Sequence, residues 1–233
     1  MKANLVQLYL VVHFMNDLLY TVHIMNTKQK EDTATLEILQ AIENRNDVTQ
    51  RHLADKLDVA LGLANSYLKS CVRKGLIKVQ QAPANRYLYY LTPKGFTEKS
   101  RLTAEYLSSS FDFYRRAGNS LNETLNICES NGWDRILLCG VSGLAEIASI
   151  RALEHDIQII GIYDKTVEKK TILNMTVFNS LSDAGNYDVC LITAFNDISD
   201  LYKLLIRKVK SERILVPSIL GFSRKEIDSL TEY

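Results

Sequence analysis

Residues 48–91 read VTQRHLADKLDVALGLANSYLKSCVRKGLIKVQQAPANRYLYYL. The pattern of this segment indicates the fold of the first half of the chain. A short helical pattern covers residues 49–57, and a tight turn at 58–60 separates it from a longer pattern at 61–74. Gly75 then supplies the left-handed residue that commonly ends a helix. The stretch therefore predicts two helices joined by a turn.

A β-hairpin is expected directly after these helices. Two strand-prone runs, residues 76–79 and 86–91, flank a polar tip that contains Pro83. An apolar periodicity over residues 31–44 adds one more helix in front. Two helices followed by a hairpin are the parts of a winged helix-turn-helix, which lays the second of its two helices in the major groove of DNA.

The helix expected at residues 61–74 has two different faces. At about 100° per residue, its apolar face consists of Leu61, Ala64, Leu68, Cys71 and Val72. The opposite face is small, polar and basic and contains no carboxylate, so it suits phosphates and base edges. We expect contacts with double-stranded DNA from Thr49, Gln50, Arg51, Asn65, Ser66, Lys69, Arg73 and Arg86. An ordinary solvated helix is the alternative, which the joint presence of helix pair, glycine and hairpin disfavours.

Four short motifs in this segment carry a family resemblance: Thr49-Gln50-Arg51, Asn65-Ser66-Tyr67-Leu68, Lys74-Gly75-Leu76-Ile77-Lys78 and Leu91-Thr92-Pro93-Lys94-Gly95. Over about residues 33–106, the chain resembles the MarR-type winged-helix regulators associated with bacterial exopolysaccharide gene clusters. The resemblance implies a transcription regulator. Ala60 departs from it, because such regulators usually place a capping serine there, and the loss would cost about 1 kcal/mol of helix stability.

Charge is distributed unevenly along the chain. The 233 residues carry a net charge of only +1 and are long enough for two compact units. Residues 27–101 contain thirteen basic and eight acidic side chains, whereas residues 132–233 contain twelve and fourteen. The positive charge therefore lies on the segment expected to bind DNA. Because an excess of five charges gives modest affinity, we expect the protein to bind as a homodimer.

The scarce reactive side chains give no sign of metal or disulfide chemistry. The four cysteines form no C-x-x-C pair, and the four histidines lack the spacing of metal ligands. We therefore expect reduced thiols in a cytoplasmic protein. The apolar run at residues 5–25 is interrupted by His13, Asn16, Asp17 and His23, so we expect no membrane association.

The chain is expected to have four segments. Residues 1–26 are an N-terminal segment with two interpretations: an extra amphipathic helix at a dimer interface, or sequence upstream of a true start at Met25. The second is slightly favoured. Residues 27–95 form the winged helix-turn-helix domain, residues 96–131 a helical linker and dimerisation segment, and residues 132–233 a second domain.

The linker helix shows a heptad-like seam. Apolar or small residues recur in steps of three and four at Leu107, Phe111, Tyr114, Gly118, Leu121, Leu125 and Cys128. The seam favours a homodimer through the central helices, because winged-helix regulators read two half-sites around a twofold axis. A helix packed on its own domain is the alternative. Gly118 indicates either a bend or a close helix crossing.

Strands and helices alternate in residues 132–233. Strands are expected at 135–139, 157–163, 176–178, 189–193 and 214–216. Helices are expected after residue 140 and at 198–210. The fold class is thus an α+β winged helix-turn-helix domain followed by an α/β Rossmann-like domain with a parallel sheet.

A glycine-rich turn in this domain resembles a dinucleotide-binding fingerprint. The motif Gly140-x-Ser142-x-x-Ala145 lies between a strand and a helix, and Asp164 ends the next strand 24 residues after Gly140. We expect phosphates on the amides near Ser142 and ribose on Asp164. The expected ligand-binding residues are Gly140, Ser142, Gly143, Leu144, Asp164 and Thr193. The alternative is a Rossmann fold that binds no ligand and serves in docking.

The same region is similar to the nucleotide-sugar-binding N-terminal domain of sialic-acid-type O-acyltransferases, over about residues 135–217. The resemblance implies a small nucleotide-type effector, and the ligand identity stays open between a nucleotide sugar, NAD and a CoA-like molecule. Rex-type redox repressors share this domain layout, so an NAD(H)-sensing repressor is one alternative. A small nucleotide-sugar-modifying enzyme is the other, but a Tyr-x-x-x-Lys pair is absent from this half. We therefore expect a regulator and no enzyme.

Overall fold

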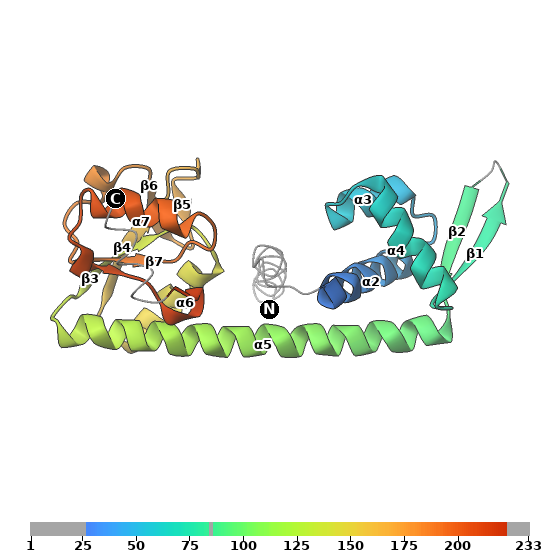
Figure 1. The fold of residues 1–233 in the computed structure, drawn as a ribbon, viewed down its shortest axis with the longest axis horizontal. Coiled ribbons are helices and arrows are strands. Elements are labelled where there is room, and N and C mark those ends of the chain that lie inside the picture. The colour runs from blue at the N-terminus through green and yellow to red at the C-terminus, as the bar shows by residue number, and fades with distance from the viewer. Residues whose placement is uncertain (1–26, 84–85, 223–233) are drawn as a thin grey trace. The chain divides into compact units, whose positions relative to one another are not determined.

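A computed structural model describes residues 27–83 and 86–222 of the chain (Figure 1). The N-terminal segment 1–26 lies outside the described residues, and both of its interpretations lie there with it. The chain divides into two compact units, a winged-helix unit within residues 24–111 and a sheet unit within residues 112–233. The boundary falls inside the long helix α5 (Pro93–Ser130).

The winged-helix unit has the predicted order of helices and hairpin. It contains α2 (Thr27–Asn44), α3 (Gln50–Leu57), α4 (Leu61–Arg73), β1 (Ile77–Ala82) and β2 (Arg86–Leu91). The two strands are antiparallel and pair from Ile77 opposite Leu91 to Ala82 opposite Arg86. Buried side chains from all three helices and the base of the hairpin share one core, so the hairpin is anchored to the helices.

The turn between α3 and α4 depends on backbone geometry. Asp58 adopts the left-handed conformation with φ of 49°, and the N–H of Val59 donates to the carbonyl of Ala54 at 3.1 Å. Ala60 caps α4 without a side-chain hydrogen bond, as expected for an alanine at that position. The apolar face of α4 is narrower than predicted. Leu61 and Val72 are exposed, and the core takes the helix's other three predicted residues.

The motif Thr92-Pro93-Lys94-Gly95 joins the hairpin to α5. The Thr92 hydroxyl donates to the carbonyl of Gly75 at 2.7 Å and accepts from the N–H of Gly95 at 3.0 Å. A Cβ atom added to Gly95 would lie 2.1 Å from the carbonyl oxygen of Leu76. The first turn of α5 therefore packs directly against the backbone between α4 and β1, which explains the glycine.

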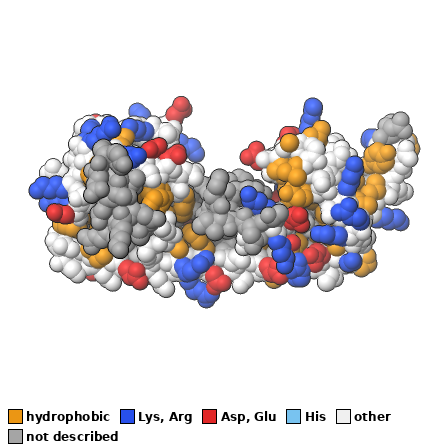
Figure 2. Space-filling model, in the orientation of Figure 1, with side chains coloured by type: hydrophobic (Ala, Val, Ile, Leu, Met, Phe, Trp, Pro, Cys, Tyr) orange, Lys and Arg blue, Asp and Glu red, His pale blue; other side chains and the backbone are white. Residues whose placement is uncertain are grey.

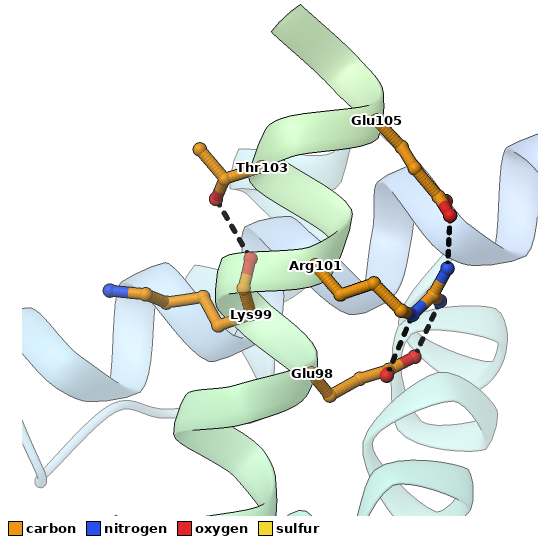
Figure 3. Close-up of polar contacts among 5 residues, drawn as sticks. All are labelled: Glu98, Lys99, Arg101, Thr103 and Glu105. Atoms are coloured by element: carbon orange, nitrogen blue, oxygen red, sulfur yellow. Dashed lines mark hydrogen bonds and ion pairs between the residues drawn. The ribbon is translucent and has the colours of Figure 1, made fainter. Parts of the chain in front are cut away.

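On the exposed side of α5, Arg101 forms ion pairs with two acidic residues of the same helix (Figure 3). The guanidinium of Arg101 contacts both oxygens of Glu98 and one oxygen of Glu105. The Thr103 hydroxyl donates to the carbonyl of Lys99 at 2.8 Å, one turn earlier. Lys99 itself pairs with Glu43 of α2. Because its neighbours neutralise it, Arg101 adds little free positive charge.

The sheet unit contains the alternating elements that the sequence predicts. Its order is β3 (Arg135–Cys139), α6 (Gly143–Arg151), β4 (Gln158–Tyr163), β6 (Met175–Phe178), β7 (Val189–Ile192), α7 (Ile198–Ile206) and β8 (Ile214–Leu215). An unpredicted two-residue strand, β5 (Thr171–Ile172), pairs antiparallel with β6. The sheet order is β5-β6-β4-β3-β7-β8, and every other pairing is parallel.

Helices cover both faces of this sheet. On β3, Ile136 and Leu138 pack in one core with α5 and α6, whereas Leu137 and Cys139 pack in another with α7. The strands are therefore buried on both faces, which accounts for their nearly continuous apolar sequences. Within the described residues, no helix combines the length and the hydrophobicity that a bilayer crossing requires.

The predicted dimer contact through the heptad-like seam is wrong for the second half of α5. Leu121, Leu125 and Cys128 are fully buried in the sheet unit's own core. They are therefore closed to a partner subunit. Leu107 and Phe111, in the first half of the seam, are 43% and 63% exposed.

Gly118 marks a close crossing and no bend. The helix α5 is continuous through it, and a Cβ atom there would lie 2.7 Å from a guanidinium nitrogen of Arg151. Arg151 comes from α6 and lies 6.0 Å from the centre of the Tyr114 ring.

Candidate DNA-binding surface and ligand cavity

The outward face of α4 carries the predicted DNA-contacting residues. Ser66, Lys69 and Arg73 are exposed, and Asn65 is half-buried at the edge of this face. Arg73 donates to the hydroxyl of Ser70 at 3.4 Å, so its guanidinium lies along the helix. Figure 2 shows basic side chains around α4 and the hairpin on the visible side of the winged-helix unit. The α4 sequence has no acidic residue, so this surface can approach an anion.

Of the three predicted residues at the start of α3, one caps the helix and the other two have side chains free to meet DNA. Thr49 is the N-cap, and its hydroxyl accepts from the N–H of His52 at 3.1 Å. Gln50 and Arg51 in the first turn are exposed. Arg86 is exposed on β2 beside the hairpin tip, where its Nε donates to the carbonyl of Pro83 at 3.5 Å. All the predicted DNA-contacting residues thus lie in the winged-helix unit, and Asn65 alone is partly covered.

Sequence reasoning missed two features of the α4 surface. Leu63 is 45% exposed at the first turn of the helix, where a recognition helix contacts bases. Gly62 has open space where a Cβ atom would lie, so packing does not require a glycine there. Helical periodicity of about 100° per residue places both residues on the outward face, and this is the signal that could have identified them. A groove of about 410 Å³ between α2 and α4 adds Lys30 and Lys74 to this basic surface.

The sheet unit contains a cavity of about 710 Å³, here called the ligand cavity. It lies at the carboxyl ends of β3, β4 and β7, where the loops after these strands form its walls. Its lining includes the predicted residues Gly140, Ser142, Gly143 and Asp164. Leu144 and Thr193 do not line it, because both are fully buried. Their predicted direct contact with a ligand is therefore corrected.

Gly140 is required by the neighbouring strand. Its φ is +105°, and an added Cβ atom would lie 2.5 Å from the Cβ of Ala194. Ala194 follows β7 and donates its N–H to the carbonyl of Cys139 at 3.1 Å. The close passage of two strand ends thus already requires a glycine at position 140, whether or not a ligand binds there.

The hydroxyl of Ser142 caps α6 and ties it to β7. It accepts from the N–H of Leu144 at 3.0 Å and of Ala145 at 3.4 Å, and it donates to the carbonyl of Thr193 at 2.5 Å. The hydroxyl of Thr193 donates in turn to the carbonyl of Gly140 at 2.6 Å. These bonds hold the first turn after β3 against the end of β7. One amide expected to bind phosphate, that of Leu144, is therefore already satisfied.

Asp164 holds the turn after β4. One carboxylate oxygen accepts from the N–H of Val141 at 2.9 Å, and the other accepts from the N–H and the hydroxyl of Thr166. Partial burial raises the pKa of this carboxyl, but the hydrogen bonds to its charged form outweigh burial, and the net pKa is lowered. Asp164 is therefore ionised at neutral pH, and it lines the cavity.

Three further charged side chains line the cavity and were not predicted: Lys165, Asp197 and Asp200. All are exposed, and none forms an ion pair or hydrogen bond with the side chains that the structure describes. Asp197 stands at the N-cap of α7 in the left-handed conformation, and its side chain does not cap the helix. Phe195, Leu201 and Leu204 supply an apolar wall. Among the described residues, no group of acidic, histidine or cysteine side chains could hold a metal ion.

Comparison with protein families identifies the fold of the winged-helix unit. Residues 31–78 match the winged helix-turn-helix DNA-binding family. No curated protein matches the chain. The predicted winged helix-turn-helix is thus confirmed, and the chain carries a DNA-binding domain of this kind.

Solved structures offer only distant likenesses. A MarR family transcription regulator, SP03579, is 22% identical over 49% of this chain and 80% of its own, with a TM-score of 0.34. MepR, a transcription regulator of the Staphylococcus aureus multidrug efflux pump MepA, is 20% identical over 48% and 81%, with a TM-score of 0.31. Human N-acetylserotonin methyltransferase is 13% identical over 90% and 79%, with a TM-score of 0.30. At these scores, the likenesses carry no argument about fold or function.

Proposed function

We propose that this protein is a homodimeric transcription regulator of MarR type that binds double-stranded DNA through α3, α4 and the hairpin. The observation that carries the proposal is the exposed, carboxylate-free face of α4 inside a winged helix-turn-helix. Ser66 and Leu63 would meet base edges, where a leucine side chain suits a thymine methyl group. Lys69 and Arg73 would neutralise phosphates. Such a protein acts where the DNA is, and a cytoplasmic location is part of the proposal.

Phosphate contacts at the edge of the α4 surface follow from the same placement. Gln50 and Arg51 stand at the N-terminus of α3, which offers amides and a positive dipole end to an anion. Arg86 lies on the hairpin, from which it would reach the neighbouring backbone or minor groove. Thr49 would contribute by holding the start of α3, since its hydroxyl already caps that helix.

A homodimer is proposed through the exposed part of the seam. Leu107 and Phe111 are one turn apart on α5 and are both exposed, although both are large and apolar. Burying such side chains against a second copy would stabilise a dimer by about 1.5–3 kcal/mol each. A twofold axis there would present two α4 helices to two half-sites, about 34 Å apart along the DNA.

The sheet unit is proposed to bind a nucleotide-type metabolite in the ligand cavity. If its parallel strands are numbered along the chain, their order is 3-2-1-4-5, which is that of dinucleotide-binding Rossmann folds. The cavity lies at the carboxyl ends of the strands where this order reverses, and ligands bind there in open α/β sheets. Asp164 would accept hydrogen bonds from ribose. A link to polysaccharide genes rests on the sequence resemblance alone.

Selection from a random duplex library tests the regulator and the dimer together. Full-length protein would be incubated with the library, and bound sequences would be recovered and sequenced. We expect enrichment of an inverted repeat whose half-sites are centred about 10 base pairs apart. Recovery of unenriched sequence after several rounds would contradict the proposal, because it would show binding without recognition.

A further inference from the structure

The groove between α2 and α4, here called the α2–α4 groove, shares residues with the proposed DNA-binding face. Its volume is about 410 Å³. From α4 it is lined by Ser66 and Arg73, which were predicted to contact DNA, and by Ser70 between them. From α2 it is lined by Lys30, which belongs to the first turn of that helix. An anion held on this face of α4 can therefore also be reached by a side chain of α2.

Positive charge exceeds negative charge along the groove. Three basic side chains line it, those of Lys30, Arg73 and Lys74, and the one carboxylate among its described lining residues is that of Glu31. All four side chains are exposed. Within the part of the chain that the structure describes, none of the four forms an ion pair. The groove therefore attracts an anion.

Elsewhere in the winged-helix unit, carboxylates neutralise several basic side chains. The pairs are Arg45 with Asp47, Lys56 with Glu37, Lys99 with Glu43, and Arg101 with Glu98 and Glu105. Hydrogen bonds from Arg101 lower the pKa of Glu98, and the charge of Lys74 adds to this effect, so Lys74 is partly engaged. Lys30 and Arg73 lack such a carboxylate. Because like charges on two sides of a groove repel, an anion between them would stabilise the arrangement.

The lining of the groove suits a phosphate better than an organic effector. Pockets for small organic molecules are mostly apolar, whereas Leu63 is the one aliphatic side chain among the described residues that line this groove. The hydroxyl of Ser70 accepts a hydrogen bond from Arg73 at 3.4 Å, so its own O–H is available as a donor. Ser66 adds a second hydroxyl. Hydroxyl, guanidinium and ammonium groups are the usual donors to DNA phosphates.

We propose that the α2–α4 groove binds one phosphate of the DNA backbone in each half-site. Lys30 contacts this phosphate from α2, and Arg73 and Ser70 contact it from α4. Glu31 weakens the contact by repulsion and so limits its strength. This inference rests on the DNA-binding role proposed above, and it adds α2 to the elements that touch DNA.

Two neighbouring lysines of α2 provide a matched test. Lys30→Met removes the charge and keeps much of the side-chain length. Lys28→Met is the control, because Lys28 is exposed two residues earlier, about 200° away around the helix, and does not line the groove. We expect Lys30→Met to weaken DNA binding about threefold to tenfold at low salt and to reduce the salt slope by about one per subunit. Lys28→Met should bind as the wild type does, and Glu31→Gln should bind more tightly.

Neutral substitutions in the DNA identify the contacted phosphate. Duplexes with the inverted repeat recovered from the random library would carry a methylphosphonate at one backbone position at a time. Wild-type protein should lose affinity at each contacted phosphate. Lys30→Met should lose this sensitivity at one position in each half-site and keep it at the others, because the partner of that phosphate is already absent. Arg73→Met should lose it at the same position.

Three results would overturn the inference. Wild-type affinity and salt slope for Lys30→Met would contradict the contact from α2 and leave DNA binding through α4 standing. A weakened Lys30→Met that stayed sensitive at every phosphate would show that Lys30 acts only through the general field of the protein. Failure of the wild type to bind DNA would contradict the regulator itself, and the inference with it.

Discussion

The carboxylate of Asp164 accepts a hydrogen bond from the backbone N–H of Val141 at 2.9 Å, across 23 positions of sequence. This bond joins the end of β4 to the turn that follows β3. The acid expected to bind ribose therefore also fastens the rim of the cavity. Asp164 thus links the stability of the sheet unit to the shape of its ligand site.

The contribution of the Asp164 carboxylate to the stability of the sheet unit should depend on pH, and the asparagine variant measures it. The lowered pKa of Asp164 means that its contribution to stability is complete at pH 7 and starts to fall near pH 4, where the unfolded chain takes up a proton. It vanishes below the folded-state pKa. We expect Asp164→Asn to lower the free energy of unfolding by about 1–2 kcal/mol at pH 7 and by less at pH 3.5. Urea unfolding followed by fluorescence of Trp133, the only tryptophan, reports on this unit. If the variant lowered the free energy of unfolding equally at both pH values, the charged carboxylate would not be the stabilising group.

Leu125 should behave as a core residue of the sheet unit. Its side chain is fully buried, so Leu125→Ala should cost about 2–5 kcal/mol through lost burial and the cavity left behind. The Trp133 urea transition should shift to lower denaturant. A shift corresponding to less than 1 kcal/mol would mean that this part of α5 does not pack on the sheet.

Leu107 and Phe111 should matter for assembly and hardly for folding. Both are exposed, so Leu107→Ser with Phe111→Ser should leave the Trp133 transition unchanged at protein concentrations low enough that the wild type and the variant are both monomeric. Sedimentation velocity should show a dimer for the wild type and a monomer for this double variant. A monomeric wild type at micromolar concentration, or a variant that stays dimeric, would rule out the proposed interface.

Two helical glycines should respond oppositely to alanine. Gly62 has open space for a Cβ atom, so Gly62→Ala should stabilise α4 by about 0.5–1 kcal/mol yet weaken DNA binding several-fold if the helix backbone approaches DNA. Gly95→Ala pushes a methyl group against the carbonyl of Leu76 and should cost about 1–3 kcal/mol. Thermal unfolding monitored by helix circular dichroism distinguishes them. Tighter DNA binding by Gly62→Ala would show that the backbone there is not close to DNA.

Most helices and strands could be predicted, because apolar periodicity and turn residues depend on the local sequence alone. The strand predicted at 135–139 is observed with those bounds, and the predicted helix pair and hairpin are present. The dimer contact predicted from the second half of the α5 seam was wrong for a general reason. A period of three and four identifies an apolar face, and Leu121 and Leu125 do lie on one, but it does not say which surface covers that face.

The ligand site was only partly predictable. Gly140 and Asp164 line the cavity as expected, since the spacing of a strand, a turn and an acid is a property of sequence. The burial of Leu144 and Thr193 depends on which hydroxyl takes which backbone group, and spacing carries no information about that. Asp197 and Asp200 lie at the start of α7, after β7, and the sheet order brings this helix start to the cavity.

Binding of fluorescently labelled duplex DNA, measured by anisotropy over a range of salt concentrations, tests whether the α4 face contacts the DNA backbone. Lys69→Ala with Arg73→Ala removes two charges from the α4 face, and Arg45→Ala with Arg101→Ala removes two that carboxylates already neutralise. The account predicts that the first pair weakens binding at every salt concentration and reduces the slope of log affinity against log salt by about two per subunit. The control pair should bind as the wild type does. Unchanged affinity and slope for Lys69→Ala with Arg73→Ala would contradict the account.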